Sequence, residues 1–453
     1  MSIATASNQG SVTATPMRIM VVDDSVVIRG LTARWLEEAG HKVVATCNNG
    51  RVAVDQIARA KPEIVLLDIE MPEMDGITAL PLLLAKCPGV SVVVVSTLTQ
   101  RNAQTSLKCL SLGAVDYLAK PESHRGVSTS VTFRHDLMIK IEGLAARHRD
   151  GVDAAMTPAM SAGMSAGMSA GGAGARPMAA APGARTFRVE RGAPAAAAAG
   201  SGGRQFLRAP PAGGAGASAS ASARHGPAGN VPAAASSYAR APAAPSRAAP
   251  TLRPVASNTP KRVLVVGAST GGPRAVGEFL TGLGPQLRNL PVLVVQHMPP
   301  VFTAVFAEHL GAQTGLPAAE AQDGEALQPG RIYVAPGGKH MGLRRNGGSG
   351  IALRLDDGAP VNFCKPAVDV LFFDAATIFG AQVLSVVLTG VGSDGTHGAR
   401  AIGEAGGAVI VQDEATSTVW GMPGSIAKAG LAHEILPLRD MAGAARRFLG
   451  GSR

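Results

Sequence analysis

Three apolar runs of this chain each end beside a chemically active side chain. Ser269 lies in LVVGASTGGP, His297 in PVLVVQHMPP and Asp394 in LTGVGSDGTHG. A hydroxyl nucleophile, an imidazole base and an orienting carboxylate together perform acyl transfer in serine hydrolases. We therefore interpret Ser269, His297 and Asp394 as a catalytic triad at the ends of parallel strands. Their order along the chain differs from the Ser, Asp, His order of the α/β-hydrolase fold.

The glycine-rich turn around Ser269 suits an exposed nucleophile, because small neighbours permit a tight bend from strand to helix. A helix is expected to begin near Gly272-Pro273, where free N–H groups can hold an oxyanion. Nucleotide binding is the alternative, although the chain lacks G-x-G-x-x-G and a P-loop lysine here. His340, in APGGKHMGL, is the rival base, and no HxxxH or HxE cluster predicts a catalytic metal.

A second constellation lies near the N-terminus. Asp23 and Asp24 end one apolar run, Asp68 ends a later one, and Lys120 a third. The carboxyl ends of parallel strands converge on one crevice, where three carboxylates need a divalent cation such as Mg²⁺. Asp68 is the expected phosphoryl acceptor, and Lys120 would pair with the phosphoryl oxygens. Ser96, or its neighbour Thr97, could hydrogen-bond the phosphate.

The elements that must position these residues alternate between strands and helices, which predicts two α/β domains with mostly parallel, doubly wound sheets. Helices are expected at 26–40 and 128–149. The expected strands of the first domain are 18–24, 41–47, 63–69, 90–96 and 114–120. The second domain begins with KRVLVVGAS at 261, and its further strands are expected at 331–336, 350–355 and 407–413.

The segment between the domains differs sharply in composition. Residues 150–258 consist mainly of Ala, Gly, Ser, Pro and Arg, with the repeat MSAGMSAGMSAGG at 160–172. Too few large apolar side chains are present to offset the entropy of ordering, so a flexible linker is predicted. A basic docking tract is the alternative. We also expect residues 1–16 to be disordered.

Charge and cysteine usage exclude several classes of protein. Of the net charge of +10, a surplus of eight falls within 151–260, where ten arginines face only two acids. These arginines are spaced out, which argues against nucleic-acid binding by a folded domain. The four cysteines form no CxxC pair, which argues against disulfides and against a zinc site. No apolar stretch of 18 residues occurs, and the first residues lack the basic start and apolar run of a signal peptide, so none is expected. We expect a cytoplasmic protein without disulfides and without membrane insertion.

Strings in both halves resemble a known family. The DD, LLDIEMPEMDG and LAKP strings resemble the receiver domain of two-component response regulators. GASTGGP, QHMP, APGGKHM, KPAVDVLF and LTGVGSDG resemble the chemotaxis-type protein-glutamate methylesterases. The resemblance divides the chain into a receiver domain (17–140) of flavodoxin-like (βα)5 fold, the linker, and a catalytic domain (259–453).

The resemblance also implies roles for individual residues. Ser269 would be the nucleophile, His297 the general base and Asp394 its orienting acid. The N–H of Val391 would help form the oxyanion hole, and Thr270 would support the site. Ser96 and Tyr117 would shift when Asp68 is phosphorylated, Mg²⁺ would bind Asp23, Asp24 and Asp68, and the catalytic domain would need no cofactor. Asp369 is expected to cap a helix.

The implied function is phosphorylation-activated demethylation of glutamyl methyl esters, and deamidation of glutamines, on chemoreceptor cytoplasmic helices. A chemotaxis histidine kinase would supply the phosphoryl group. An esterase with the same triad serving a non-chemotaxis array is one alternative. A response regulator whose C-terminal domain only binds partners is another, and labelling of Ser269 by a fluorophosphonate probe would exclude it.

Overall fold

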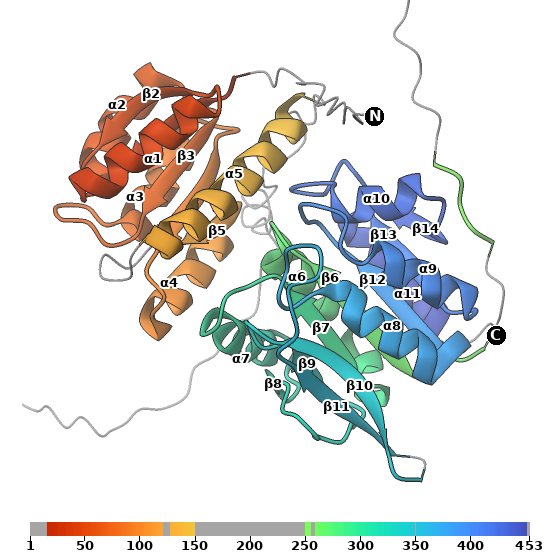
Figure 1. Ribbon diagram of the computed structural model, residues 1–453. Coiled ribbons are helices and arrows are strands. Elements are labelled where there is room, and N and C mark those ends of the chain that lie inside the picture. Colours follow the sequence, from red (N-terminus) through yellow and green to blue (C-terminus); the bar gives the residue numbers. More distant parts are fainter. Residues whose placement is uncertain (1–15, 121–126, 150–249, 255–258, 349, 451–453) are drawn as a thin grey trace, which may run out of the picture. The chain divides into compact units, whose positions relative to one another are not determined.

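The computed structural model in Figure 1 describes residues 16–120, 127–149, 250–254, 259–348 and 350–450. Residues 1–15 of the predicted disordered N-terminus lie outside this part of the chain. So does the predicted linker, except for residues 250–254, where the Arg253 N–H donates to the Ala432 carbonyl (2.8 Å). Contacts with the C-terminal domain therefore begin upstream of the predicted boundary at 259.

The N-terminal domain contains one parallel sheet of five strands in the order β2-β1-β3-β4-β5. The strands are β1 (Arg18–Val22), β2 (Lys42–Cys47), β3 (Ile64–Asp68), β4 (Ser91–Ser96) and β5 (Asp116–Ala119). This order is that of flavodoxin-like folds, whose switch point lies between the first and third strands. The fold predicted for this domain is confirmed.

Polar side chains start four of the helices in the N-terminal domain. Ser25, Asn49, Asp75 and Thr99 each accept a hydrogen bond from an N–H of the first turn, which a helix cannot satisfy internally. The helices are α1 (Val26–Glu38), α2 (Gly50–Ala60), α3 (Gly76–Lys86), α4 (Gln100–Ser111) and α5 (Val127–Arg149). Side chains alternate across β1, so Ile19 packs with α5 residues and Met20 with α2 residues on the other face.

The C-terminal domain contains a parallel sheet of seven strands in the order β14-β13-β12-β6-β7-β9-β8. The strands are β6 (Val263–Ala268), β7 (Val292–Gln296), β8 (Ala318–Glu320), β9 (Ile332–Val334), β12 (Val383–Val387), β13 (Ala408–Gln412) and β14 (Glu434–Leu436). The core strands β6, β7, β12 and β13 are fully buried and mostly apolar, as expected for a sheet covered on both faces.

One predicted strand lies outside this sheet. The segment predicted at 350–355 forms β11 (Gly350–Asp356), which pairs antiparallel with β10 (His340–Asn346) as a two-stranded sheet. Only Ala352 and Leu353 of this strand are buried, which is typical of a half-exposed ribbon rather than of a buried central strand.

Helices cover both faces of the seven-stranded sheet (Figure 1). Side chains alternate along β6, so Leu264 packs with residues of α6, α7 and α11, and Val265 packs with residues of α8 and α9. These helices are α6 (Gly272–Leu283), α7 (Phe302–Thr314), α8 (Val368–Phe379), α9 (Thr396–Glu404), α10 (Met422–Lys428) and α11 (Leu438–Gly450). Short 3₁₀ turns occupy Gly284–Asn289 and Gly380–Gln382. None of the described helices has the length and apolar character needed to span a membrane.

The chain reverses its direction of strand addition between β6 and β12. From β6 the sheet grows outward through β7, and from β12 it grows the other way through β13. At such a switch point the loops after the two strands diverge and leave a crevice, where open α/β sheets bind ligands. The fold therefore places the loops after β6, β7 and β12 side by side at the carboxyl edge of the sheet.

Candidate active site

The three loops that carry Ser269, His297 and Asp394 lie beside one another at the carboxyl edge of the sheet. They follow the adjacent strands β6, β7 and β12. Backbone hydrogen bonds tie the loops together: the Ser269 N–H donates to Thr389 (3.0 Å), and the His297 N–H donates to Ala268 (3.1 Å). The predicted arrangement of the three loops at one edge is thus observed.

Asp394 is a buried carboxylate at the junction of two helices, with 2% of its surface exposed. It accepts five hydrogen bonds, from His297 Nε2 (2.8 Å), Asn362 Nδ2 (3.0 Å) and the N–H groups of Val368 (2.6 Å), Asp369 (3.1 Å) and Gly395 (2.9 Å). Burial alone would raise the pKa of Asp394. The hydrogen bonds from His297 and the backbone outweigh it and hold the pKa below its ordinary value, so the carboxylate stays charged.

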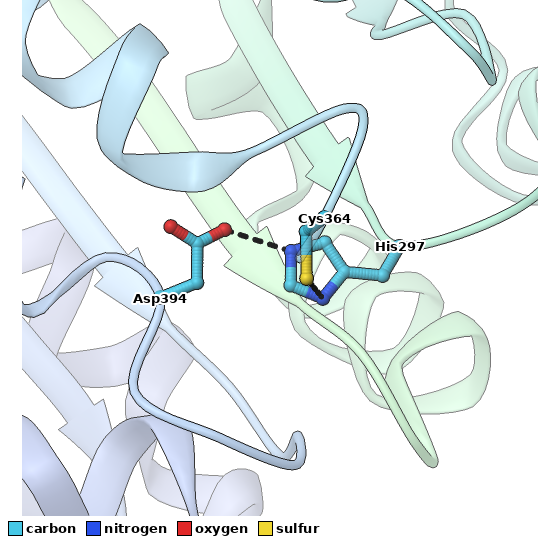
Figure 2. A group of neighbouring side chains, drawn as sticks. All are labelled: His297, Cys364 and Asp394. Atoms are coloured by element: carbon cyan, nitrogen blue, oxygen red, sulfur yellow. Dashed lines mark hydrogen bonds and ion pairs between the residues drawn. The ribbon is translucent and has the colours of Figure 1, made fainter. Parts of the chain in front are cut away.

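The imidazole of His297 lies between Asp394 and Cys364 (Figure 2). Its Nε2 donates to Asp394 Oδ2 (2.8 Å), and its Nδ1 is 3.5 Å from Cys364 Sγ. Because Nε2 is committed to the carboxylate, Nδ1 is the nitrogen that can accept a proton. Burial disfavours the imidazolium, but the hydrogen bond with Asp394 and the contact with Cys364 outweigh it and raise the pKa of His297 to about 10.

Ser269 is half-buried on the turn into α6. Gly271 on this turn has φ 75°, and a Cβ there would lie 2.3 Å from Thr418 Oγ1, so only glycine fits. The Ser269 carbonyl accepts from Gln296 Nε2 (2.8 Å). Among the described residues, no hydrogen bond joins the Ser269 hydroxyl to His297. The thiol of Cys364 faces Nδ1 instead.

The groups expected to hold an oxyanion lie next to Ser269. A Cβ on Gly390 would lie 2.8 Å from Ser269 Cβ, so the backbone that leads into Val391 runs against the serine. Within the described part of the chain, the Val391 N–H makes no hydrogen bond. Thr270 is buried, and its carbonyl accepts from Thr389 Oγ1 (2.9 Å), which ties the turn after β6 to the turn after β12.

His340 and Asp369 have structural roles. His340 is buried, its Nδ1 accepts from the Ala367 N–H (3.2 Å), and its Nε2 is 3.0 Å from the Ala359 carbonyl. With both ring nitrogens bonded to backbone, the rival base lies outside the triad. Asp369 Oδ1 accepts from the Gly398 N–H (2.7 Å) in the first turn of α9. It therefore caps α9, although it belongs to α8.

Sequence reasoning missed the hairpin that brings Asn362 and Cys364 to the site. Val361 and Cys364 exchange two backbone hydrogen bonds, and the two residues between them, Asn362 and Phe363, have φ 52° and 62°. Positive φ at both central residues is the pattern of a type I′ turn. This turn directs the Asn362 amide to Asp394 and the Cys364 thiol to His297. The one sequence feature that could have pointed to Asn362 and Cys364 is that they directly precede the KPAVDVLF string.

The N-terminal acids and Lys120 meet at the switch point of the first sheet. Lys120 Nζ is 2.7 Å from Asp68 Oδ2, 3.0 Å from Asp23 Oδ2 and 4.0 Å from Asp24 Oδ1. Burial raises the pKa of Asp68 to about 6 against the opposing effect of Lys120, and burial likewise raises the pKa of Asp23. For both carboxyls, the effect of burial on the pKa is larger than the opposing effect of Lys120.

The three carboxylates fit a magnesium ion. One oxygen from each of Asp23, Asp24 and Asp68 lies within 4.8 Å of the others, and hard oxygen ligands are those that Mg²⁺ prefers. Ser96 ends β4 and shares a hydrogen bond with Ser106 (2.9 Å). Tyr117 lies in β5, with Lys140 Nζ 5.3 Å from its ring centroid. No described hydrogen bond links Ser96 or Tyr117 to the acids.

Comparisons with known proteins match both domains. A family model described as CheB methylesterase matches residues 264–445, and one described as response regulator receiver domain matches residues 19–132. The chain is similar to the catalytic domain of the Thermotoga maritima CheB methylesterase, with 39% identity, 41% of this chain and 97% of that chain covered, and a TM-score of 0.39.

Full-length relatives are also found. The chain is 44% identical over 463 residues to the protein-glutamate methylesterase/protein-glutamine glutaminase of group 2 operon from Bradyrhizobium diazoefficiens, with 100% of both chains covered. It is 44% identical over 457 residues to a protein-glutamate methylesterase/protein-glutamine glutaminase from Rhodopseudomonas palustris (strain HaA2), again with 100% of both covered. A relative from Caulobacter vibrioides is 39% identical, with 93% of this chain and 96% of that chain covered.

Proposed function

Because this chain belongs to the family of protein-glutamate methylesterases/protein-glutamine glutaminases, we propose that it hydrolyses glutamyl methyl esters and deamidates glutamines on chemoreceptors during chemotactic adaptation. The observation that carries this proposal is the His297–Asp394 pair, which lies at the switch point of the sheet beside the Ser269 turn. Methanol release from methylated receptor membranes is the direct test. A protein that releases none under any condition would be a partner-binding regulator instead.

The chemistry follows from the roles of the three side chains. Ser269 Oγ attacks the ester carbonyl while His297 Nδ1 takes its proton, and Asp394 holds the ring and stabilises the imidazolium. The Val391 N–H and the N-terminus of α6 stabilise the oxyanion. The imidazolium then protonates the departing methoxide, and methanol leaves a glutamyl ester on Ser269. Water, activated by the same nitrogen, releases glutamate. A glutamine loses ammonia by the same steps.

The hydroxyl of Ser269 must reach Nδ1, which Cys364 faces in the described structure. Rotation of Ser269 about its Cα–Cβ bond and displacement of the thiol would bring the nucleophile to the base. Catalytic hydrogen bonds often form only when substrate is bound. The structure corresponds to a resting state in which the Cys364 thiol, rather than the Ser269 hydroxyl, contacts His297 Nδ1.

The N-terminal domain would control this activity through Asp68. Asp68 Oδ accepts a phosphoryl group from a histidine kinase, and Lys120 pairs with the new phosphoryl oxygens. Mg²⁺ held by Asp23, Asp24 and Asp68 would neutralise the carboxylates and the incoming charge. Phosphorylation replaces the single negative charge of the carboxylate by about −2 on the acyl phosphate and breaks the pair between Lys120 and Asp68, so the surroundings of β4 and β5 must rearrange.

Replacing Asp68 by asparagine should abolish activation by acetyl phosphate, because the carboxylate that accepts the phosphoryl group is gone. Initial rates of methanol release with and without acetyl phosphate and Mg²⁺ should then be equal. Asp55→Asn, an exposed acid on α2 away from the cluster, is the matched control and should be activated like the wild type. Equal activation of the Asp68 variant would refute phosphorylation at this residue.

Activity should rise with pH above neutrality, because a general base must be deprotonated and the pKa of His297 is raised to about 10. The contact with Cys364 contributes to the raised pKa of His297. Cys364→Ala should therefore move the acid limb of the kcat/KM profile to lower pH. An imidazole titration followed by NMR gives an independent reading. An unchanged profile in the variant would show that the thiol does not influence the base.

A further inference from the structure

We propose that Cys364 Sγ and His297 Nδ1 form a binding site for a thiophilic divalent cation, of which Zn²⁺ is the reference ion. Binding there would switch the triad off. The two atoms face each other at 3.5 Å (Figure 2). The binding itself rests on geometry and ligand chemistry. Only the inhibition rests on the proposed function.

The separation of the two atoms suits a shared metal ion. With Zn–S near 2.3 Å, Zn–N near 2.05 Å and a tetrahedral angle, the sulfur and nitrogen ligands lie about 3.6 Å apart. The observed distance between Cys364 Sγ and His297 Nδ1 is 3.5 Å. No large movement of either side chain is therefore needed to admit the ion.

Asp394 completes the arrangement from the far side of the ring. A histidine that binds a metal through one nitrogen commonly donates the N–H of the other to a carboxylate, which fixes the tautomer and orients the ring. Here Nε2 donates to Asp394 Oδ2 (2.8 Å), and four further hydrogen bonds hold that carboxylate in place. Nδ1 thus faces Cys364, and its lone pair is available to a metal ion that displaces the ring proton.

The ligand types favour a soft ion over Mg²⁺. Thiolate and imidazole suit Zn²⁺, whereas carboxylates suit Mg²⁺. The two groups should therefore prefer different metal ions. The acids Asp23, Asp24 and Asp68 offer only oxygen ligands, whereas Cys364 and His297 offer sulfur and nitrogen. Cys364 is partly exposed, so an ion can reach it from solvent, and water or a small anion would fill the remaining positions.

The consequence for catalysis follows from the proton balance. Zn²⁺ replaces the thiol proton of Cys364 and, when the ring is protonated, the Nδ1 proton of His297. These protons are released to solvent, and the ion occupies the lone pair of Nδ1. That nitrogen can then neither take the proton of Ser269 nor return it to the leaving group. An occupied site would therefore hold the enzyme inactive until the ion is removed, without any change to Asp68.

The binding test uses the full-length protein with excess Mg²⁺ to saturate the carboxylate site. Titration calorimetry with Zn²⁺ should show one strong site in the wild type. The affinity for Zn²⁺ should fall at least about 100-fold in Cys364→Ser. Loss of a direct ligand costs at least as much affinity as loss of a residue that only hydrogen-bonds a ligand. Co²⁺ should give a thiolate-to-metal charge-transfer band that this variant lacks. Cys87→Ser, at a half-buried thiol of the N-terminal domain, is the matched control and should bind like the wild type.

Two further measurements separate the claims. Asp394→Asn should weaken Zn²⁺ binding about 10- to 100-fold through the ring it orients. Zn²⁺ should inhibit methanol release by the wild type with a midpoint equal to its dissociation constant, and a chelator should restore the rate. Cys364→Ser, compared with its own metal-free rate, should resist the same concentration.

Equal Zn²⁺ affinity in the wild type and Cys364→Ser, or a cobalt spectrum without the charge-transfer band, would overturn the proposed site. Binding that depends on Cys364 in a protein without esterase activity would instead support the site and contradict the proposed function. Tight Zn²⁺ binding without inhibition of methanol release would support Cys364 and His297 as ligands and contradict the proposed inhibition.

Discussion

Replacing Ser269 by alanine should lower kcat for methyl ester hydrolysis by about 10⁶-fold, the loss expected when a triad nucleophile is removed. The domain should remain folded, because the Ser269 hydroxyl makes no hydrogen bond with another described residue, while its backbone carries the loop contacts. Methanol release measured beside the circular dichroism spectrum distinguishes lost chemistry from lost structure.

The matched variant for this experiment is Cys364→Ala. The structure places a thiol rather than the serine hydroxyl at Nδ1 of His297, so Cys364 is the rival nucleophile. If Ser269 is the nucleophile, the alanine variant at 364 should keep most of its turnover, and a fluorophosphonate probe should label only Ser269. Loss of turnover in Cys364→Ala together with activity in Ser269→Ala would reassign the nucleophile to the cysteine.

Asp394→Asn should lower kcat by about 10⁴-fold and the free energy of unfolding by about 3–5 kcal/mol. An amide cannot hold His297 in the tautomer that leaves Nδ1 free. It also cannot accept five hydrogen bonds, and its NH₂ group would face the N–H groups of Val368 or Gly395. The combined loss should be visible in urea unfolding and in steady-state rates.

Asp369→Asn separates these two effects. Asp369 is also buried and also caps a helix, through Gly398, but no hydrogen bond or ion pair of the described residues joins it to His297. This variant should be destabilised while keeping far more activity than Asp394→Asn. Similar losses of kcat in both variants, with both proteins folded, would contradict the specific role of Asp394 toward the base.

The sequence by itself determined the elements and the loops that carry chemistry. Its buried apolar runs predicted β6, β7 and β12, and Gly272-Pro273 predicted the start of α6. These are local features, because burial on both faces of a parallel sheet and the first turn of a helix depend on a few neighbouring residues. The convergence of the acids and Lys120 followed from the same rule about strand ends.

Only the tertiary structure decided how the side chains meet. Strand order placed β6 between β7 and β12, and the turn at Asn362 and Phe363 brought Cys364 to His297 from a separate loop. The donors to Asp394 come from segments 25 to 97 residues away, in addition to its immediate neighbour. Contacts between such distant segments leave no periodic signal in the sequence, because they depend on packing around the switch point rather than on local conformation. The same packing assigned the ring nitrogens of His297, which no spacing of residues could have indicated.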